Sequence, residues 1–192
     1  YDAQFWYGGD YNRLWIETEG DHVLSGGDGG ELEKLDVQYS RRIARYWDVQ
    51  AGIGYQRHYG PGPDQDRTYA VAGFQGLAPY WFEVDANLRV SEDGDASADL
   101  EAEYDWLLTQ RLILQPRFET SFAFQEVEPF GVGQGLNYVK TGLRLRYEIR
   151  REFAPYIGVT WMKKMGDTAD LARSEDEDVE TAGVVAGVRM WF

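Results

Sequence analysis

The chain of 192 residues contains no cysteine, only two histidines and three methionines, and no excess of basic side chains. Without cysteine it has neither a disulfide framework nor a thiolate metal site. Its 33 acidic and 19 basic residues give a net charge of −14, which excludes nucleic acid as a main partner. The longest stretch without a charged side chain, residues 68–82, has 15 residues and is shorter than the roughly 20 that a membrane-spanning helix needs. A helical membrane protein is therefore excluded.

Aromatic residues make up 15% of the chain, alongside 22 glycines. Because disordered chains are poor in aromatic residues, an intrinsically disordered chain is also excluded. The length fits one domain or at most two small ones, and the composition marks no boundary. We therefore expect residues 1–192 to form a single domain. The chain starts at Tyr1 without a charged and apolar leader, as expected of a mature or trimmed polypeptide.

Apolar and polar residues alternate along most of the chain, which is the period of a β-strand. Residues 82–91 and 98–106 show the pattern most clearly, with a charged or polar side chain at almost every second position. The predicted strands cover residues 4–19, 31–41, 47–58, 67–77, 80–91, 96–107, 111–125, 136–148, 153–164 and 179–192. Long and short connections alternate between them, which indicates an up-and-down meander with both termini at the short-turn end. Strands of this length exceed the ~5–6 residues usual in soluble sheets and suit a membrane-spanning barrel.

The period alone does not say which face lies inside, so a soluble, lipocalin-like barrel is the alternative. Three features favour the membrane barrel: charges at mid-strand on the polar face, aromatic residues near the strand ends, and a last strand that ends on an aromatic residue, Phe192. The mid-strand charges include Glu17, Asp36, Asp85, Glu101, Arg117, Arg144 and Arg189. The strand-end aromatics include Trp47, Tyr80, Trp81, Trp106, Tyr147, Phe153, Tyr55, Phe122, Phe124 and Trp161. We predict an all-β, closed, antiparallel transmembrane β-barrel of ten strands, with eight or twelve as alternatives.

Charge is sorted between the two ends of this barrel. The long connections, at 21–30, 60–66, 92–95, 126–135 and 165–178, contain fifteen acidic residues and one basic residue, Arg173. Basic residues gather at the short turns, at Arg41, Arg42, Arg45, Arg150 and Arg151. Hydrophilic loops alone would explain high charge but not charge of one sign, so an end that attracts cations is predicted.

Metal ligands other than carboxylates are few, and their spacing matches no known metal motif. By strand parity, His58 and Met162 face the interior near the long-loop end, His22 and Met165 lie at or in loops, and Met190 faces lipid. Imidazole and thioether groups together suit copper better than magnesium or calcium. The candidate metal ligands are therefore His58, Met162, His22 and Met165, although hydrogen bonding for the histidines and packing for the methionines is the simpler explanation of each.

Enzymatic chemistry has little support in the sequence. It contains no nucleophile elbow, zinc-protease motif or phosphate-binding loop, so we expect no enzyme. A protease at the barrel rim is an alternative, with His58 near Asp64 and Asp66. The acidic rows Glu83/Asp85 and Asp99/Glu101/Glu103 would fit a glycosidase, but they face Arg117, Arg144 and Arg146 and are more simply explained as a ladder of ion pairs in the interior.

Several long segments resemble the copper resistance protein B family of bacterial outer-membrane proteins. They are YWDVQAGIGY (46–55), GFQGLAPYWFEVDANL (73–88), LEAEYDWLLTQRLILQPR (100–117), GLRLRYEIRREFAPYIGV (142–159) and VAGVRMWF (185–192). The resemblance implies a Gram-negative outer-membrane β-barrel of a copper resistance or homeostasis system, with periplasmic termini, that binds copper or passes it across the membrane. It also implies that the Met- and His-rich segment found ahead of the barrel in family members lies outside this chain.

The partners implied are outer-membrane lipid and lipopolysaccharide, copper ions and periplasmic copper-resistance proteins. Weakly bound copper is the expected cofactor or cargo. A structural alternative is a barrel that anchors an N-terminal copper-binding segment in the membrane and transports nothing.

Overall fold

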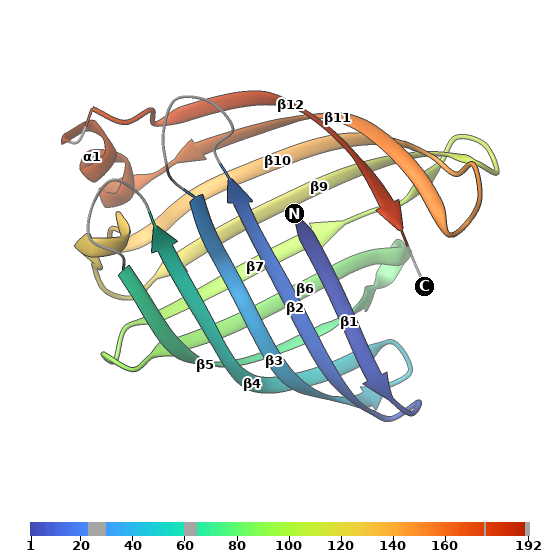
Figure 1. The fold of residues 1–192 in the computed structure, drawn as a ribbon, viewed down its shortest axis with the longest axis horizontal. Coiled ribbons are helices and arrows are strands. Elements are labelled where there is room, and N and C mark those ends of the chain that lie inside the picture. The colour runs from blue at the N-terminus through green and yellow to red at the C-terminus, as the bar shows by residue number, and fades with distance from the viewer. Residues whose placement is uncertain (23–29, 60–64, 175, 191–192) are drawn as a thin grey trace.

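The computed structural model describes residues 1–22, 30–59, 65–174 and 176–190, which form one antiparallel β-sheet that curls into a barrel-like wall (Figure 1). Each strand pairs with its neighbours in the chain, in the order β1 to β7 and then β9 to β12, while the short β8 pairs only with β9. The strands are β1 (Asp2–Gly8), β2 (Asn12–His22), β3 (Gly30–Ala44), β4 (Trp47–Tyr59), β5 (Gln65–Ala78), β6 (Phe82–Ser91), β7 (Ala96–Glu103), β8 (Trp106–Leu107), β9 (Leu112–Ala123), β10 (Gly135–Tyr147), β11 (Phe153–Lys164) and β12 (Glu180–Met190).

The connections at one end of the wall are mostly short and those at the other mostly longer, as the sequence predicts. Two places depart from this sorting: residues 92–95 at the long-loop end form a short connection, and residues 104–111, which include β8, form a longer one at the short-turn end. Two 3₁₀ turns, η1 (Pro79–Trp81) and η2 (Glu128–Phe130), and one helix, α1 (Gly166–Ser174), lie in the connections. Helix α1 packs against the long-loop end of β10, where Thr168 is buried and its hydroxyl accepts a hydrogen bond from the Gly133 amide at 2.9 Å. No helix in the described part of the chain is long and apolar enough to cross a membrane.

The prediction of ten strands is wrong at the first segment. Residues 4–19 are not one strand but a hairpin, in which β1 and β2 are joined by a turn at residues 9–11. Gly8 enters this turn with φ of 147°, a value that favours glycine, and the Gly9 amide donates a hydrogen bond to the Asn12 carbonyl at 3.0 Å. The segment predicted at 96–107 is interrupted between β7 and β8, although Tyr104 still donates its amide hydrogen to the Pro116 carbonyl at 3.2 Å.

The extra hairpin also changes the end of the wall at which Tyr1 lies. Strand β1 runs towards the short turns, so Tyr1 lies beside Gly20, and its amino group donates to the Gly20 carbonyl at 2.7 Å. The prediction that both termini lie at the short-turn end is therefore wrong for the first residue, whereas β12 does end there (Figure 1). The sheet is not closed within the described residues either, because β1 and β12 do not pair with each other.

Candidate functional site

Burial is inverted relative to a soluble protein, because the polar face of the wall lies inside. In β3, Asp36 and Gln38 are 0% and 1% exposed, whereas the intervening Val37 and the following Tyr39 are 38% and 53% exposed. A soluble barrel would bury the apolar row instead. The two faces of each strand therefore separate a charged interior from an apolar outer surface.

An arginine on β6 connects the interior faces of strands that are not neighbours. Arg89 forms an ion pair with Asp99 on the adjacent β7 and a second one with Asp36 on β3, at 3.5 Å. Asp36 also accepts a hydrogen bond of 2.6 Å from the Tyr69 hydroxyl on β5, and the Arg89 guanidinium lies 5.5 Å from the Tyr69 ring centre. These four side chains form a cluster, here called the Arg89 cluster, that links β3 to β6 across the interior.

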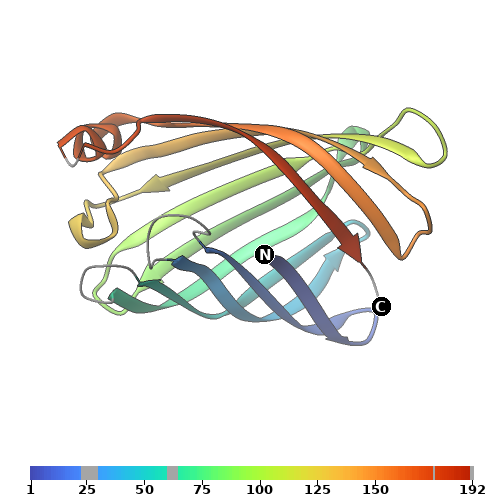
Figure 2. The same ribbon diagram turned by 45° about the horizontal axis from the view of Figure 1, so that its top comes forward.

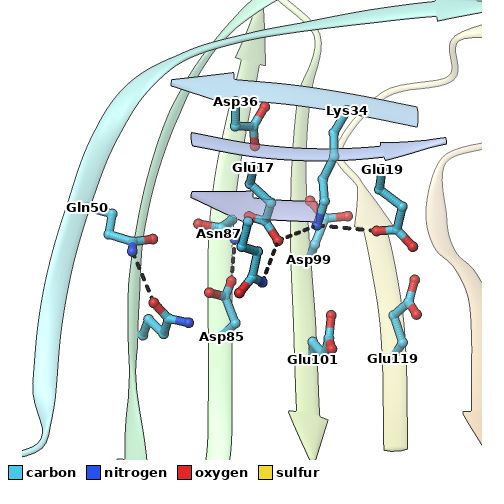
Figure 3. Close-up of polar contacts among 12 residues, drawn as sticks. Glu17, Glu19, Lys34, Asp36, Gln50, Asp85, Asn87, Asp99, Glu101 and Glu119 are labelled. Carbon is cyan, nitrogen blue, oxygen red and sulfur yellow. Dashed lines mark hydrogen bonds and ion pairs between the residues drawn. The ribbon is translucent and has the colours of Figure 1, made fainter. Parts of the chain in front are cut away.

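Two further cations are each surrounded by carboxylates. Lys34 on β3 lies 3.0 Å from Glu17 and 3.4 Å from Glu19, both on β2. Figure 3 shows these groups facing acidic side chains of β6, β7 and β9 from the opposite wall.

On that opposite wall, Arg117 lies 2.9 Å from Glu101 and 3.3 Å from Glu103, which confirms the predicted ladder for this residue. Glu119 is shared between Arg117, at 3.8 Å, and Lys140, at 3.2 Å. Arg146, also assigned to the ladder, pairs instead with Asp105 at 2.6 Å. The interior therefore contains many charges of both signs held in pairs.

Some buried polar atoms of the interior have no hydrogen-bond partner among the described residues. They include both amide atoms of Gln38 and Nε of Arg89. Buried polar groups are almost always satisfied by protein or by water. These atoms are therefore available to water, so the interior is polar in composition and offers sites for hydration.

The long-loop end is acidic, as predicted, in the part that the structure describes. Helix α1 and the residues after it carry Asp167, Asp170, Asp176, Glu177 and Asp178. Within this end the cations are engaged locally, Arg173 with Asp170 at 2.5 Å and Lys164 with Glu177 at 2.7 Å. Asp28, Asp64 and Glu175 lie outside the described residues, as do the side chains of Asp21 and Glu128.

The predicted metal ligands do not converge on neighbouring strands. His58 lies near the end of β4, opposite Glu31 of β3 and Gln65 of β5, and is exposed. Met162 lies on β11, opposite Lys140 and Thr181, with five strands of the wall between it and His58. Both face the interior at the long-loop end, but from different parts of the wall.

The other two candidates are less well placed. Met165 lies between β11 and α1, half-buried, and its amide donates to the Asn137 carbonyl at 2.8 Å. His22 ends β2 in register with Gly30, and its side chain lies outside the described residues. No group of three histidine, aspartate or glutamate side chains in the described ranges is arranged to hold a metal ion.

The rim-protease pairing is not formed by the described residues. His58 is in register with Gln65, and the next pair along the same ladder is Arg57 with Asp66. Neighbouring positions of a strand point to opposite faces, so His58 and Asp66 lie on different faces of the wall. Asp64 lies outside the described residues.

Strand parity locates most of the interior charges, but it does not identify which of them meet. Lys34 and Tyr69 were not singled out from the sequence, although both stand at interior-facing positions of long strands. The signal that could have found Lys34 is its place on the polar row of β3 opposite the acidic row of β2. Tyr69 carries no such signal, because a tyrosine is common on either face of a barrel strand.

Together, the curled antiparallel sheet, the charged interior and the apolar outer face define a porin-like β-sheet protein. Among solved structures, the chain is similar to one titled "NanC porin structure in rhombohedral crystal form", with a TM-score of 0.57 at 11% sequence identity over 100% of this chain and 99% of the other. At this level of identity the likeness shows the fold alone.

Sequence comparison places the chain more narrowly. The profile of the family described as "Copper resistance protein B precursor (CopB)" matches residues 1–192. The chain is 44% identical over 189 residues to "Copper resistance protein B" of Escherichia coli, covering 97% of this chain and 61% of that protein. It is 42% identical over 194 residues to "Copper resistance protein B homolog" of Pseudomonas syringae pv. tomato, covering 100% of this chain and 63% of that protein. The chain belongs to the copper resistance protein B family and spans about three fifths of the length of these relatives.

Proposed function

We propose that this chain forms a closed barrel in the outer membrane of a Gram-negative bacterium and binds copper or passes it across that membrane. The observation that carries the proposal is the inverted burial, with paired charges inside and large apolar side chains such as Tyr39, Ile53 and Val184 exposed outside. Exposed apolar surface of this extent is unfavourable in water and suits the acyl chains of lipid and lipopolysaccharide. The family membership supports copper as the cargo.

The ends of the barrel then take different roles. Long loops usually face the outside of the cell and short turns the periplasm, so the acidic long-loop end meets external cations first. A cluster of acidic residues raises the local concentration of cations. His58 and Met162, with His22 and Met165 nearer the loops, offer imidazole and thioether groups to copper just inside this entrance. The protein acts without catalysis, and the short-turn end faces periplasmic copper-resistance proteins.

Copper uptake by lipid vesicles that contain the purified protein tests the proposal. We expect copper to enter these vesicles faster than empty vesicles, with less uptake in a His58→Ala, Met162→Ala double variant. Met190→Ala is the matched control, because Met190 lies on the outer face and is exposed. Uptake equal in the double variant and the wild-type protein would remove these two residues from the path.

The anchoring function is a second candidate, favoured by the Arg89 cluster, which joins β3 to β6 through the interior. Such a cross-link narrows the path for an ion. An anchor predicts no copper flux above that of empty vesicles, together with normal insertion of the protein into the membrane. The same vesicle measurement therefore separates the two candidates.

A further inference from the structure

The two edges of the sheet, β1 and β12, each have a partner on one side only. Within the described residues, β1 pairs with β2 alone and β12 with β11 alone (Figure 2). The interior-facing side chains of β1 are correspondingly uncovered: Trp6 stacks on Trp15 of β2 but is still 48% exposed, whereas interior-facing Asp36 and Gln50 are buried. This open seam lies between β1 and β12 along the length of the wall.

An open seam is incompatible with a membrane. The edge of a strand presents unpaired amide and carbonyl groups at every second residue, and hydrocarbon offers them no partner. Since β12 alone is eleven residues long, its free edge exposes several such groups. If the chain spans the outer membrane as proposed above, a premise on which this inference rests, the seam has to be filled.

Strand direction shows what kind of partner fits. Gly8, at the end of β1, adjoins the turn at residues 9–11, and Met190, at the end of β12, is in register with Phe153, which follows the short connection at 148–152. Both edge strands therefore run towards the short-turn end and are parallel to each other. Every ladder in the sheet is antiparallel, so direct contact between the edges would create the one parallel pair in this part of the wall. It would also leave part of β12 unpaired, because β1 has only seven residues.

A single strand that runs in the opposite direction pairs antiparallel with both edges. Polypeptide for it exists in the family, since more than a third of each of the two relatives lies outside the region matched by this chain. The β1 edge also indicates its side of origin: pairing with β2 reaches Gly20, which is hydrogen-bonded to Tyr1, and β2 continues through Asp21 to His22 without a partner on that side among the described residues. Residues ahead of Tyr1 would complete β1 up to the long-loop end and connect there to a preceding strand.

We propose that the barrel of the whole protein is closed by one further strand, supplied by the polypeptide that precedes Tyr1, which pairs with both β1 and β12. The strand runs from the short-turn end to the long-loop end. Around the wall, β7 and β8 both pair with β9 and occupy one position, so the wall has eleven positions and the further strand brings them to an even number. Its outward row is apolar, beside Phe5 and Val184, and its inward row is polar, beside Gln4 and Arg189. About 9–11 residues of alternating character are required, as for any strand that crosses the membrane.

Disulfide cross-linking tests the proposal cleanly because the chain contains no cysteine of its own. In the full-length protein, Phe5→Cys is combined in turn with Ala182→Cys, Val184→Cys, Ala186→Cys and Val188→Cys, which are the outward positions in the middle of β12. Neighbouring strands lie about 4.8 Å apart, so an intervening strand separates the two Cα positions by roughly 10 Å, beyond the ~7 Å limit for a disulfide. We expect no disulfide in any pair above the level of the single-cysteine variants.

The Val159→Cys, Val184→Cys pair is the positive control, because these residues are in register on β11 and β12. An intramolecular disulfide between Phe5→Cys and any β12 position would show direct closure and overturn the proposal. Disulfide-linked dimers of single-cysteine variants would show closure by a second copy and would overturn it as well.

Photocross-linking identifies the occupant. With the photoreactive residue p-benzoylphenylalanine at position 5 or at position 184, we expect mass spectrometry to find both positions joined to one peptide from ahead of Tyr1. A cross-linked peptide from beyond Phe192 would assign the seam to the other end of the polypeptide and contradict the proposal. A protein with the expected cross-links but no copper flux would support the seam strand and contradict transport, so the two proposals fail separately.

Discussion

Replacing Arg89 with methionine is the sharpest test of the interior architecture. The substitution keeps much of the side-chain volume but leaves Asp36, which is 0% exposed, and Asp99 without their cation. At the observed 3.5 Å, the attraction between Arg89 and Asp36 is about 5 kcal/mol for an effective dielectric constant of about 20, before the cost of desolvation. Removing one partner of a buried ion pair typically costs about 3–5 kcal/mol, so we expect the free energy of unfolding to fall by about 3 kcal/mol or more.

Urea unfolding of the protein in lipid vesicles, followed by the fluorescence of its seven tryptophans, measures this change. The matched control is Lys163→Met, which breaks the exposed pair with Glu180 at 3.6 Å, where side-chain exposures are 45% and 56%. Exposed pairs contribute about 0–1 kcal/mol, so little change is expected there. If Arg89→Met changed the free energy no more than the control does, the Arg89 cluster would be fully hydrated and the argument from burial would be refuted.

Three other predictions concern Gly54 beside Asp36, the attachment of helix α1 and the acidic long-loop end. A Cβ at Gly54 would overlap the Asp36 carboxylate, so we expect Gly54→Ala to lower the free energy of unfolding by about 1–3 kcal/mol. Gly142→Ala is the control and should change it little, because the nearest atom to the added Cβ would be 3.7 Å away. Thr168→Val removes the hydroxyl that holds α1 and should cost about 1–3 kcal/mol locally, seen as faster amide hydrogen exchange in the helix and not in β5. Neutralising the acidic residues of 165–178 should slow copper entry into the vesicles at low salt, because these charges attract cations. Near 1 M salt, where the screening length is about 3 Å, we expect no effect. An effect that persists at high salt would mean that these residues bind copper directly.

The pattern of alternation predicts most of the wall but not its turns. Both arms of the first hairpin keep a period of two, but Phe5 and Leu14 both lie on the outer face although an odd number of positions separates them, so the alternation changes phase at the turn. A single strand over residues 4–19 would place these two residues on opposite faces. The glycine pair Gly8-Gly9 is the local signal for that turn, since glycine adopts the positive φ found there. The miscounted strand then reversed the expected direction of β1 and misplaced the start of the chain.

Contacts within the interior were predictable only between adjacent strands. Arg117 meets Glu101 and Glu103 on neighbouring β7, and shared parity is enough to bring such side chains together. The contact of Arg89 with Asp36 joins β6 to β3, and it depends on the curvature of the wall, which the sequence pattern does not encode. Helix α1 was not predicted for a related reason. Its buried residues are covered by β10, which is distant in the sequence, so residues 166–174 alone give little indication of the helix.

The net charge of −14 is divided unequally between the rim and the interior of the barrel. The attraction of cations and their passage therefore depend on different parts of the molecule. The long connections contain fifteen acidic residues against one basic residue, so most of the uncompensated charge lies at the rim. Inside, the carboxylates of Glu17, Asp36, Glu101 and Glu119 are already engaged by lysine or arginine. A cation drawn from the rim would therefore have to displace a bound side chain in order to bind any of these four carboxylates. If the protein handles copper as proposed, the rim governs how strongly copper is collected, whereas the paired interior governs whether any of it goes through.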